Sequence, residues 1–116
     1  MYTLYGIPNC DSVKKARVWL DKHSIPYQFH DYKQLGITKA KLHSWCKQLG
    51  WENVFNKNST TFKELPDTER DALNSESAAI DMMIKYNSII KRPIIEQDDQ
   101  IVVVRFNEAI YQKTFL

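Results

Sequence analysis

A strand–helix–strand pattern opens the chain and constrains its fold more than any other feature. Residues 2–5 are aromatic or β-branched and stop at Gly6, which is typical of a strand that runs into a loop. Apolar side chains then recur at helical spacing from Val13 to Leu20, up to a break at residues 23–26. Residues 27–32 alternate aromatic and polar side chains and predict a second strand. In such a βαβ unit the two strands are parallel and the crossover is right-handed.

A second helix is predicted between Thr38 and Gly50. Thr38 suits the N-cap position and Gly50 suits the stop. The apolar stripe of this helix contains Leu42, Trp45, Cys46 and Leu49. Because a free cysteine behaves as a small hydrophobe, we interpret Cys46 as a core residue and not as a resolving thiol.

Further short helices are predicted before residue 90. Residues 51–61 are rich in Asn, Ser and Thr without periodicity, which indicates a structured loop. A short helix is expected from Pro66 to about Leu73. Ser75 or Ser77 then caps another helix. The apolar face of that helix is expected to hold Ile80, Met83 and Ile84. We expect a helical insertion over roughly residues 38–90.

The end of the chain predicts a hairpin and a closing helix. Residues 93–96 and 101–104 are two largely β-branched runs around the polar residues 97–100, as in an antiparallel hairpin. Asn107 can cap a last helix that runs to Leu116. The order β-α-β, helical insertion, β-β-α predicts an α/β thioredoxin-like fold with a mixed four-stranded sheet. At 116 residues, we expect a single domain over residues 1–116.

Composition excludes several classes of function. No apolar run reaches the roughly 18–20 residues of a membrane span, and the N-terminus lacks the features of a signal peptide, so we expect a cytoplasmic protein without membrane partners. Net charge is only +2 with acids and bases interleaved, which argues against nucleic acid as a partner. Cys10 and Cys46 are too few for a disulfide scaffold, and His23, His30 and His43 lack metal-ligand spacing, so no metal is expected.

Cys10 is the candidate nucleophile. It lies where the first loop enters a helix, and free backbone N–H groups and the helix dipole favour an anion there. Helix N-termini and neighbouring lysines are settings in which a cysteine pKa falls below its reference of ~8.5. Lys14, one turn on, is expected to support the thiolate, whereas Asp11 opposes it. The alternative is that Cys10 is only a small, half-buried side chain.

Two arginines and a proline near the hairpin are the other candidates. Arg92 precedes Pro93 at the start of the predicted hairpin and can clamp an oxyanion or carboxylate, although a solvated surface arginine is the ordinary alternative. Arg105 follows the last strand, so it can either converge on a shared pocket or form an exposed ion pair.

The chain resembles a known family from end to end. The opening stretch from Tyr2 to Asp11, continued by Lys14-Lys15-Ala16, resembles the arsenate reductase (ArsC) and Spx superfamily, most closely its YffB branch. The resemblance continues through residues 30–32, 50–51, 56–65 and 90–94. It implies the thioredoxin-like fold already predicted from the order of the elements.

The resemblance also implies roles for individual residues. Cys10 matches the family nucleophile, which attacks an oxidised substrate and is released by a second thiol. Arg92 matches an oxyanion-binding arginine, and Arg105 falls at a further arginine position of arsenate reductases. Pro93 matches the proline that is cis in thioredoxin-like folds and faces the cysteine, so thiol substrates are expected to dock there.

Two departures from the family narrow these expectations. A third arginine of arsenate reductases would fall near Asn56, where Lys57 or Lys14 would have to supply the charge, so arsenate is a doubtful substrate. Spx-type regulators and two-thiol reductases carry a CxxC, whereas this chain has Val13 in place of the second cysteine. The resemblance to the YffB branch therefore suggests an external thiol, glutathione or a glutaredoxin-type donor, and no bound cofactor.

Three functions are compatible with this resemblance. The first is a glutathione-dependent thiol reductase with a single catalytic cysteine. The second is an arsenate reductase coupled to glutathione and glutaredoxin. The third is a Spx-like regulator that binds RNA polymerase and has no enzymatic turnover.

Overall fold

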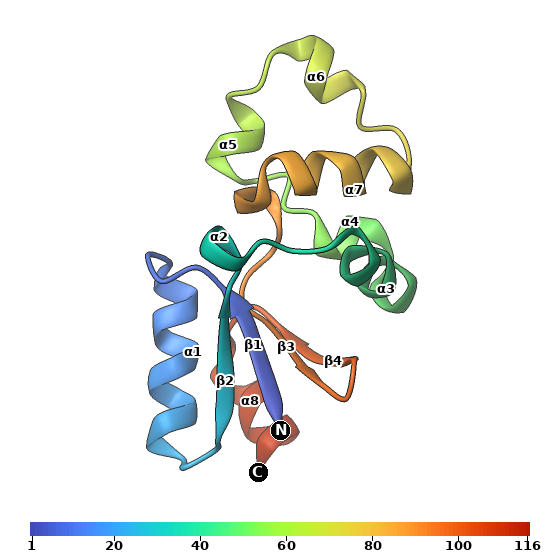
Figure 1. The fold of residues 1–116 in the computed structure, drawn as a ribbon. Coiled ribbons are helices and arrows are strands. Elements are labelled where there is room, and N and C mark those ends of the chain that lie inside the picture. The colour runs from blue at the N-terminus through green and yellow to red at the C-terminus, as the bar shows by residue number, and fades with distance from the viewer. The chain divides into compact units, whose positions relative to one another are not determined.

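Four strands form one mixed sheet in a computed structural model that describes all residues from 1 to 116 (Figure 1). The strands are β1 (Tyr2–Gly6), β2 (Tyr27–Asp31), β3 (Ile94–Gln97) and β4 (Gln100–Val104). Their order in the sheet is β2-β1-β3-β4. β1 and β2 are parallel, whereas β3 is antiparallel to both β1 and β4. The predicted thioredoxin-like order and mixed sheet are confirmed.

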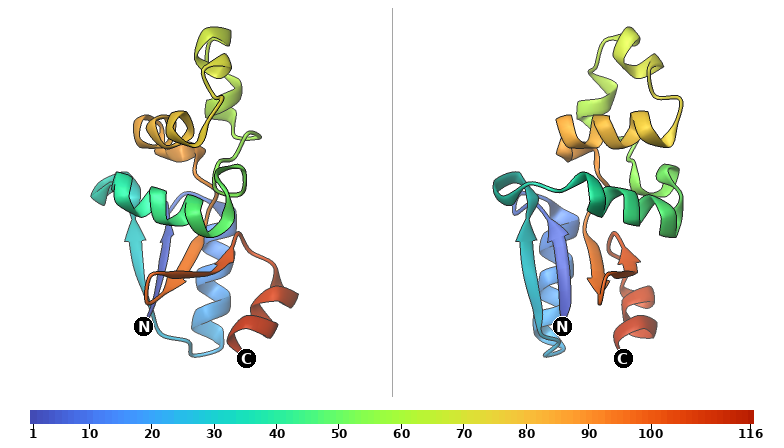
Figure 2. Two further views of the ribbon diagram at one scale, coloured as in Figure 1. Left: turned by 90° about the vertical axis from the view of Figure 1, so that its right-hand side faces the viewer. Right: turned by 45° about the vertical axis from the view of Figure 1, so that its right-hand side comes forward.

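Two helices pack on one face of this sheet, α1 (Asp11–Lys22) and α8 (Glu108–Phe115) (Figure 2). Both helices contribute to the same core, in which the Trp19 and Tyr111 rings meet edge to face at 5.4 Å. The core consists of Leu4, Val13, Ala16, Trp19, Leu20, Ile95, Val103 and Tyr111. The predicted N-cap of α8 is present, since the Asn107 side chain accepts a hydrogen bond from the backbone N–H of Ile110 at 3.0 Å.

The chain divides into two compact units, Met1–Leu35 with Arg92–Leu116, and Gly36–Lys91. The first unit holds the sheet, α1, α8 and the short helix α2 (Tyr32–Leu35). The second unit is helical. Its elements are α3 (Lys39–Leu49), α4 (Trp51–Val54), α5 (Thr60–Lys63), α6 (Asp67–Asp71), α7 (Glu76–Lys85) and the 3₁₀ helix η1 (Asn87–Ile89).

Side-chain caps begin the two long helices of the second unit. The Thr38 hydroxyl accepts the backbone N–H of Lys41 at 3.1 Å, and the Ser75 hydroxyl accepts that of Ala78 at 3.2 Å. α3 ends at Gly50, whose φ of 85° lies in a region that L side chains rarely adopt. The caps expected at Thr38 and Ser75 are therefore confirmed.

Three local predictions were wrong. Residues 51–61 were predicted as a loop, yet they contain α4 and the start of α5, because four-residue helices are too short to display a helical period. Tyr32 was placed in a strand but begins α2. Ile84 was expected on the apolar face of α7, but it is 42% exposed. The buried face of this helix includes Ala79 and Met83, and Ile84 lies outside it.

The hairpin turn is tighter than predicted. The strands extend to Gln97 and Gln100, so that only Asp98 and Asp99 form the turn. Both residues have positive φ, 52° and 65°, as the common two-residue hairpin turn requires. No helix of the chain combines the length and the apolar character needed to cross a membrane.

Candidate active site

At one edge of the sheet, across the strand direction, β1, β2 and β4 finish and β3 begins. Gly6, the last residue of β1, pairs with Asp31 at the end of the parallel strand β2. Tyr5 pairs with Ile94 at the start of the antiparallel strand β3, and Ile94 pairs with Val104 at the end of β4. The segments that follow β1, β2 and β4 and the segment that precedes β3 therefore leave the sheet at this edge, which we call the loop edge.

Most of the predicted site residues lie in these segments. Cys10 ends the loop after β1, Pro93 and Arg92 directly precede β3, and Arg105 directly follows β4. Tyr32 directly follows β2 and lies at the same edge. The register of the sheet thus gathers residues that are far apart in the sequence.

A close contact between Gly6 and Val13 sets how α1 leaves the loop edge. A Cβ atom on Gly6 would lie 2.7 Å from Cγ2 of Val13, which is closer than real Cβ contacts allow. Val13 is fully buried and β-branched, so its side chain has little freedom to move aside. The first turn of α1 can lie this close to β1 only because residue 6 is glycine.

Cys10 occupies the N-cap position of α1. Its backbone is extended, with φ −118° and ψ 127°, and its carbonyl accepts the first helical hydrogen bond from the backbone N–H of Lys14 at 2.9 Å. The side chain is half-buried and makes no capping hydrogen bond. The thiol therefore lies beside the free N–H groups of a 12-residue helix, where an anion is stabilised.

Tyr32 lies near both Arg92 and Cys10. Tyr32 is fully buried, and burial raises its pKa to about 12, against the opposing charge and hydrogen bonding of Arg92. The charges of Cys10 and Asp31 raise the pKa further, which places both within electrostatic range of the phenol. Tyr32 is therefore a neutral phenol near pH 7, and it contacts the Arg92 guanidinium without neutralising its charge. The Arg92–Pro93 peptide bond is cis.

Arg105 is fixed through its backbone. Its φ of 66° lies in the left-handed region, which costs a residue other than glycine roughly 1–2 kcal/mol. The backbone N–H of Arg105 donates to the carbonyl of Pro93 at 2.7 Å, and its own carbonyl accepts from the hydroxyl of Tyr111 at 2.6 Å. Burial raises the pKa of Tyr111, so this hydroxyl remains a donor. The Arg105 side chain is exposed.

The two lysines expected to add positive charge lie in different units. Lys14 is exposed on α1, one turn after Cys10. Lys57 belongs to the second unit, where its ammonium lies 5.5 Å from the centre of the Trp51 ring. The role of Lys57 in oxyanion binding therefore stays a prediction.

Cys46 has the surroundings expected of a core residue. It is 2% exposed in α3, and burial, together with the charges of Glu76 and Glu52, raises its pKa to about 11. Both cysteines are free thiols. In the same unit, His43 lies 3.7 Å from the Glu76 carboxylate, a partner that sequence spacing did not reveal.

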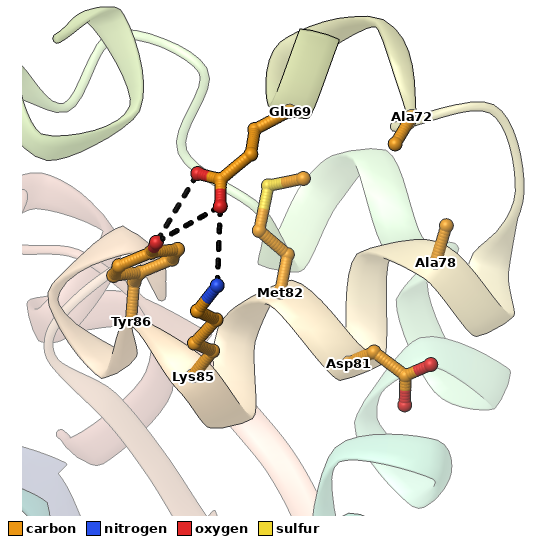
Figure 3. Close-up of a pocket in the computed structure, with 7 residues that line it drawn as sticks. All are labelled: Glu69, Ala72, Ala78, Asp81, Met82, Lys85 and Tyr86. Carbon is orange, nitrogen blue, oxygen red and sulfur yellow. Dashed lines mark hydrogen bonds and ion pairs between the residues drawn. The ribbon is translucent and has the colours of Figure 1, made fainter. Parts of the chain in front are cut away.

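A hollow in the second unit is lined partly by a polar cluster (Figure 3). The Glu69 carboxylate accepts hydrogen bonds from Lys85 at 3.1 Å and from the Tyr86 hydroxyl at 3.1 Å. The hydrogen bond from Lys85 is the largest of the influences that lower the pKa of Glu69. These hydrogen bonds tie α6 to the end of α7.

Sequence reasoning missed the two tyrosines behind the arginines. Tyr32 was predicted as the last residue of the second strand and appeared in the family resemblance, but it was given no role at the site, although its position at the end of a strand parallel to β1 was a usable signal. Tyr111 had no such signal. Its hydroxyl meets a carbonyl six residues earlier only because α8 folds back on the sheet.

Comparisons with known proteins agree with this architecture. The solved structure of a YffB protein is 41% identical, covers the whole of both chains and superposes with a TM-score of 0.93. An arsenate reductase (ArsC) related protein from Brucella melitensis is 41% identical over 98% of this chain and 93% of its own, with a TM-score of 0.77. The global transcriptional regulator Spx of Streptococcus pyogenes is 34% identical over 93% of this chain and 80% of its own length. A model of the ArsC family matches residues 5–114, and this chain therefore belongs to the ArsC family.

Proposed function

We propose that the protein is a thiol-dependent reductase that uses Cys10 as its only catalytic thiol and an external thiol, glutathione or a glutaredoxin-type donor, as reductant. The observation that carries this proposal is the position of Cys10. It is the N-cap of α1, and its half-buried thiol forms neither a capping hydrogen bond nor a disulfide. It lies at the loop edge, as do Arg92 and Arg105. Membership of the ArsC family and similarity to arsenate reductase-related proteins support the same chemistry.

The proposed reaction is a series of three thiol–disulfide exchanges. The Cys10 thiolate attacks one sulfur of an oxidised substrate, a Cys10–sulfur bond forms, and the other sulfur leaves as a thiolate that takes up a proton. A glutathione thiolate then attacks the sulfur bonded to Cys10 and releases the Cys10 thiolate. A second glutathione reduces the resulting mixed disulfide, so two glutathione molecules are oxidised for each disulfide reduced.

The arginines are assigned to the anionic part of the substrate. Arg92 keeps its charge beside the neutral Tyr32, and the backbone of Arg105 is held by Pro93 and Tyr111. A guanidinium presents a planar fork of donors that suits carboxylates and oxyanions. Lys14 is assigned to support the thiolate, and the chain at Pro93 is assigned to thiol docking.

Substitution of each cysteine tests the proposal. With glutathione and bis(2-hydroxyethyl) disulfide as substrates, Cys10→Ser is expected to lower turnover at least a thousandfold, because a serine hydroxyl cannot form the mixed disulfide with the substrate. Cys46→Ser is the matched control and should keep activity at temperatures where it is folded. Full activity of Cys10→Ser, or none in the wild type with any thiol donor, would overturn the proposal.

Arsenate reduction is the second candidate, favoured by the relative from Brucella melitensis described as arsenate reductase-related. The same cysteine and arginines would bind the oxyanion, but Asn56 stands near the third arginine position. The test is arsenate turnover with glutathione and glutaredoxin. No turnover at millimolar arsenate would reject this substrate and leave disulfide reduction intact.

A regulator without turnover is the third candidate, favoured by the 34% identity to Spx. Val13 occupies the position of the second cysteine of a CxxC, so no disulfide can form within this motif. Retention of RNA polymerase from an extract by the immobilised protein, together with absence of reductase activity, would favour this function over the first.

A further inference from the structure

A shallow groove runs along α1 beside the start of α8. It is lined by Lys14, Lys15, Val18, Trp19, Lys22 and Phe106 and has a volume of about 370 Å³. Glu108 is the single acidic residue among those that line it. All of these residues belong to the sheet-containing unit, so the groove is formed within one compact body.

The groove begins one helical turn after the proposed nucleophile. Lys14 follows Cys10 by four residues, and their backbones share the first hydrogen bond of α1. Phe106, on the other wall, directly follows Arg105. A molecule that occupies the groove therefore lies next to the loop edge, where the reaction is proposed to occur.

The charge of the groove is positive. Lys14, Lys15 and Lys22 are all exposed, and one carboxylate opposes them, so the lining carries a net charge of +2 by this count. The whole chain also carries only +2, so positive charge is concentrated here. Such a patch attracts acidic groups at low and moderate ionic strength.

The floor of the groove is apolar. Val18 lies between two of these lysines on the same stripe of α1 and is 67% exposed, an unusual exposure for a valine on an otherwise charged helix face. The half-buried ring of Phe106 adds aromatic surface, and the largely buried Trp19 lies beneath it at the wall of the groove. A small anion alone would leave this apolar surface uncovered, whereas a peptide with an aliphatic side chain would cover it.

The length of the groove suits a short peptide. Lys14 and Lys22 are eight residues apart on α1, a distance of about 12 Å at 1.5 Å per residue. An extended peptide covers that distance with about four residues at 3.3 Å each. The occupant thus needs only a few consecutive residues.

We propose that this groove docks an acidic peptide segment with an aliphatic side chain, carried by the protein whose disulfide Cys10 reduces. The proposal rests on the proposed reductase function and names its substrate class as acidic proteins. In the reaction, the Cys10 thiolate bonds to one sulfur of the docked protein, and the other sulfur leaves as a thiolate. Glutathione is the reductant that releases Cys10, as above.

Binding is tested first, independently of turnover. The probe is a fluorescein-labelled peptide with four Glu and one Leu, titrated into the Cys10→Ser protein and followed by fluorescence anisotropy. The double variant Lys15→Glu/Lys22→Glu is expected to weaken binding at least tenfold, and so is replacement of the four Glu by Gln. Val18→Asp is expected to weaken binding by a similar factor. Salt at 0.5 M should weaken wild-type binding because it screens the charges.

The matched control changes the same charge elsewhere. Lys47→Glu/Lys63→Glu reverses two exposed lysines of the second unit and should leave the affinity within twofold. Equal loss in both double variants would overturn the proposal, because net charge alone would then explain binding. Equal affinity for the Gln peptide, or no binding of the acidic peptide, would also overturn it.

Turnover separates this proposal from the one on which it rests. Lys15→Glu/Lys22→Glu is expected to reduce the uncharged bis(2-hydroxyethyl) disulfide as fast as the wild type. For a disulfide of the acidic peptide, kcat/KM should fall at least tenfold, and an equal fall for both substrates would contradict a docking role. If the wild type reduces neither disulfide, the reductase function fails while the binding result stands on its own.

Discussion

Cys10 and Cys46 are chemically the same side chain in opposite surroundings. Cys10 is the N-cap of α1, half-buried, with free helix N–H groups beside it. Cys46 lies in the body of α3, 2% exposed, with Glu76 and Glu52 near enough to raise its pKa further. Near Cys10 the backbone favours negative charge, whereas burial and carboxylates oppose it at Cys46. Position within a helix therefore separates a candidate nucleophile from a core residue.

The sharpest measure of this difference is alkylation of the native protein. At pH 7.5 we expect iodoacetamide to modify Cys10 at least 100-fold faster than Cys46, because Cys46 is buried and its pKa of about 11 leaves almost no thiolate. Mass spectrometry of peptides over time gives both rates in one sample. In denaturant the two rates should converge. Equal rates in the native protein would remove the distinction between the two regions.

The sequence predicted the role of Cys46 better than the surroundings of Cys10. The stripe that holds Leu42, Trp45 and Cys46 is a local pattern with helical spacing, and all three side chains are buried as expected. The same kind of pattern predicted α1, the hairpin and α8. One-turn helices such as α4 were missed because periodicity needs more than four residues.

The site at Cys10 depends on contacts that no local pattern encodes. Tyr32 and Arg92 are 60 positions apart in the sequence and meet because their segments leave the same edge of the sheet. The hydrogen bond from Tyr111 to Arg105 needs the packing of α8 on the sheet. The family resemblance supplied the candidate residues, and sheet register supplied their proximity.

A methyl group on Gly6 is expected to disturb the surroundings of Cys10 and not those of Cys46. Gly6→Ala should lower the free energy of unfolding by about 2–3 kcal/mol, because the new Cβ would lie 2.7 Å from a buried valine methyl of Val13. Urea unfolding measures the loss. The double variant Gly6→Ala/Val13→Ala should be more stable than the sum of the single effects predicts, because it removes the clash.

Gly36→Ala is the control for this substitution. Gly36 has φ 75° but no atom within 4 Å of a Cβ position, so only backbone strain of about 1 kcal/mol is expected. Slower alkylation of Cys10 in Gly6→Ala, but not in Gly36→Ala, would show that the close contact positions the thiol. Additive effects of the two substitutions at positions 6 and 13 would contradict the steric explanation.

Alkaline pH is expected to act through the Cys46 region. The pKa of Cys46 is raised on folding to about 11, so the unfolded chain releases its thiol proton at lower pH than the native protein. The stability contributed by the neutral thiol is therefore complete below about pH 8.5 and is lost as pH rises towards 11, by on the order of 2 kcal/mol.

Cys46→Ala should start less stable at pH 7, because it leaves a small cavity, and should lose less stability between pH 8.5 and 11. Tyr32 and Tyr111 have raised pKa values as well and keep a common slope in both proteins, so the difference between the two urea-unfolding curves isolates Cys46. Parallel curves over this range would mean that Cys46 ionises as easily in the folded protein as in the unfolded chain, and burial would then not be what distinguishes it from Cys10.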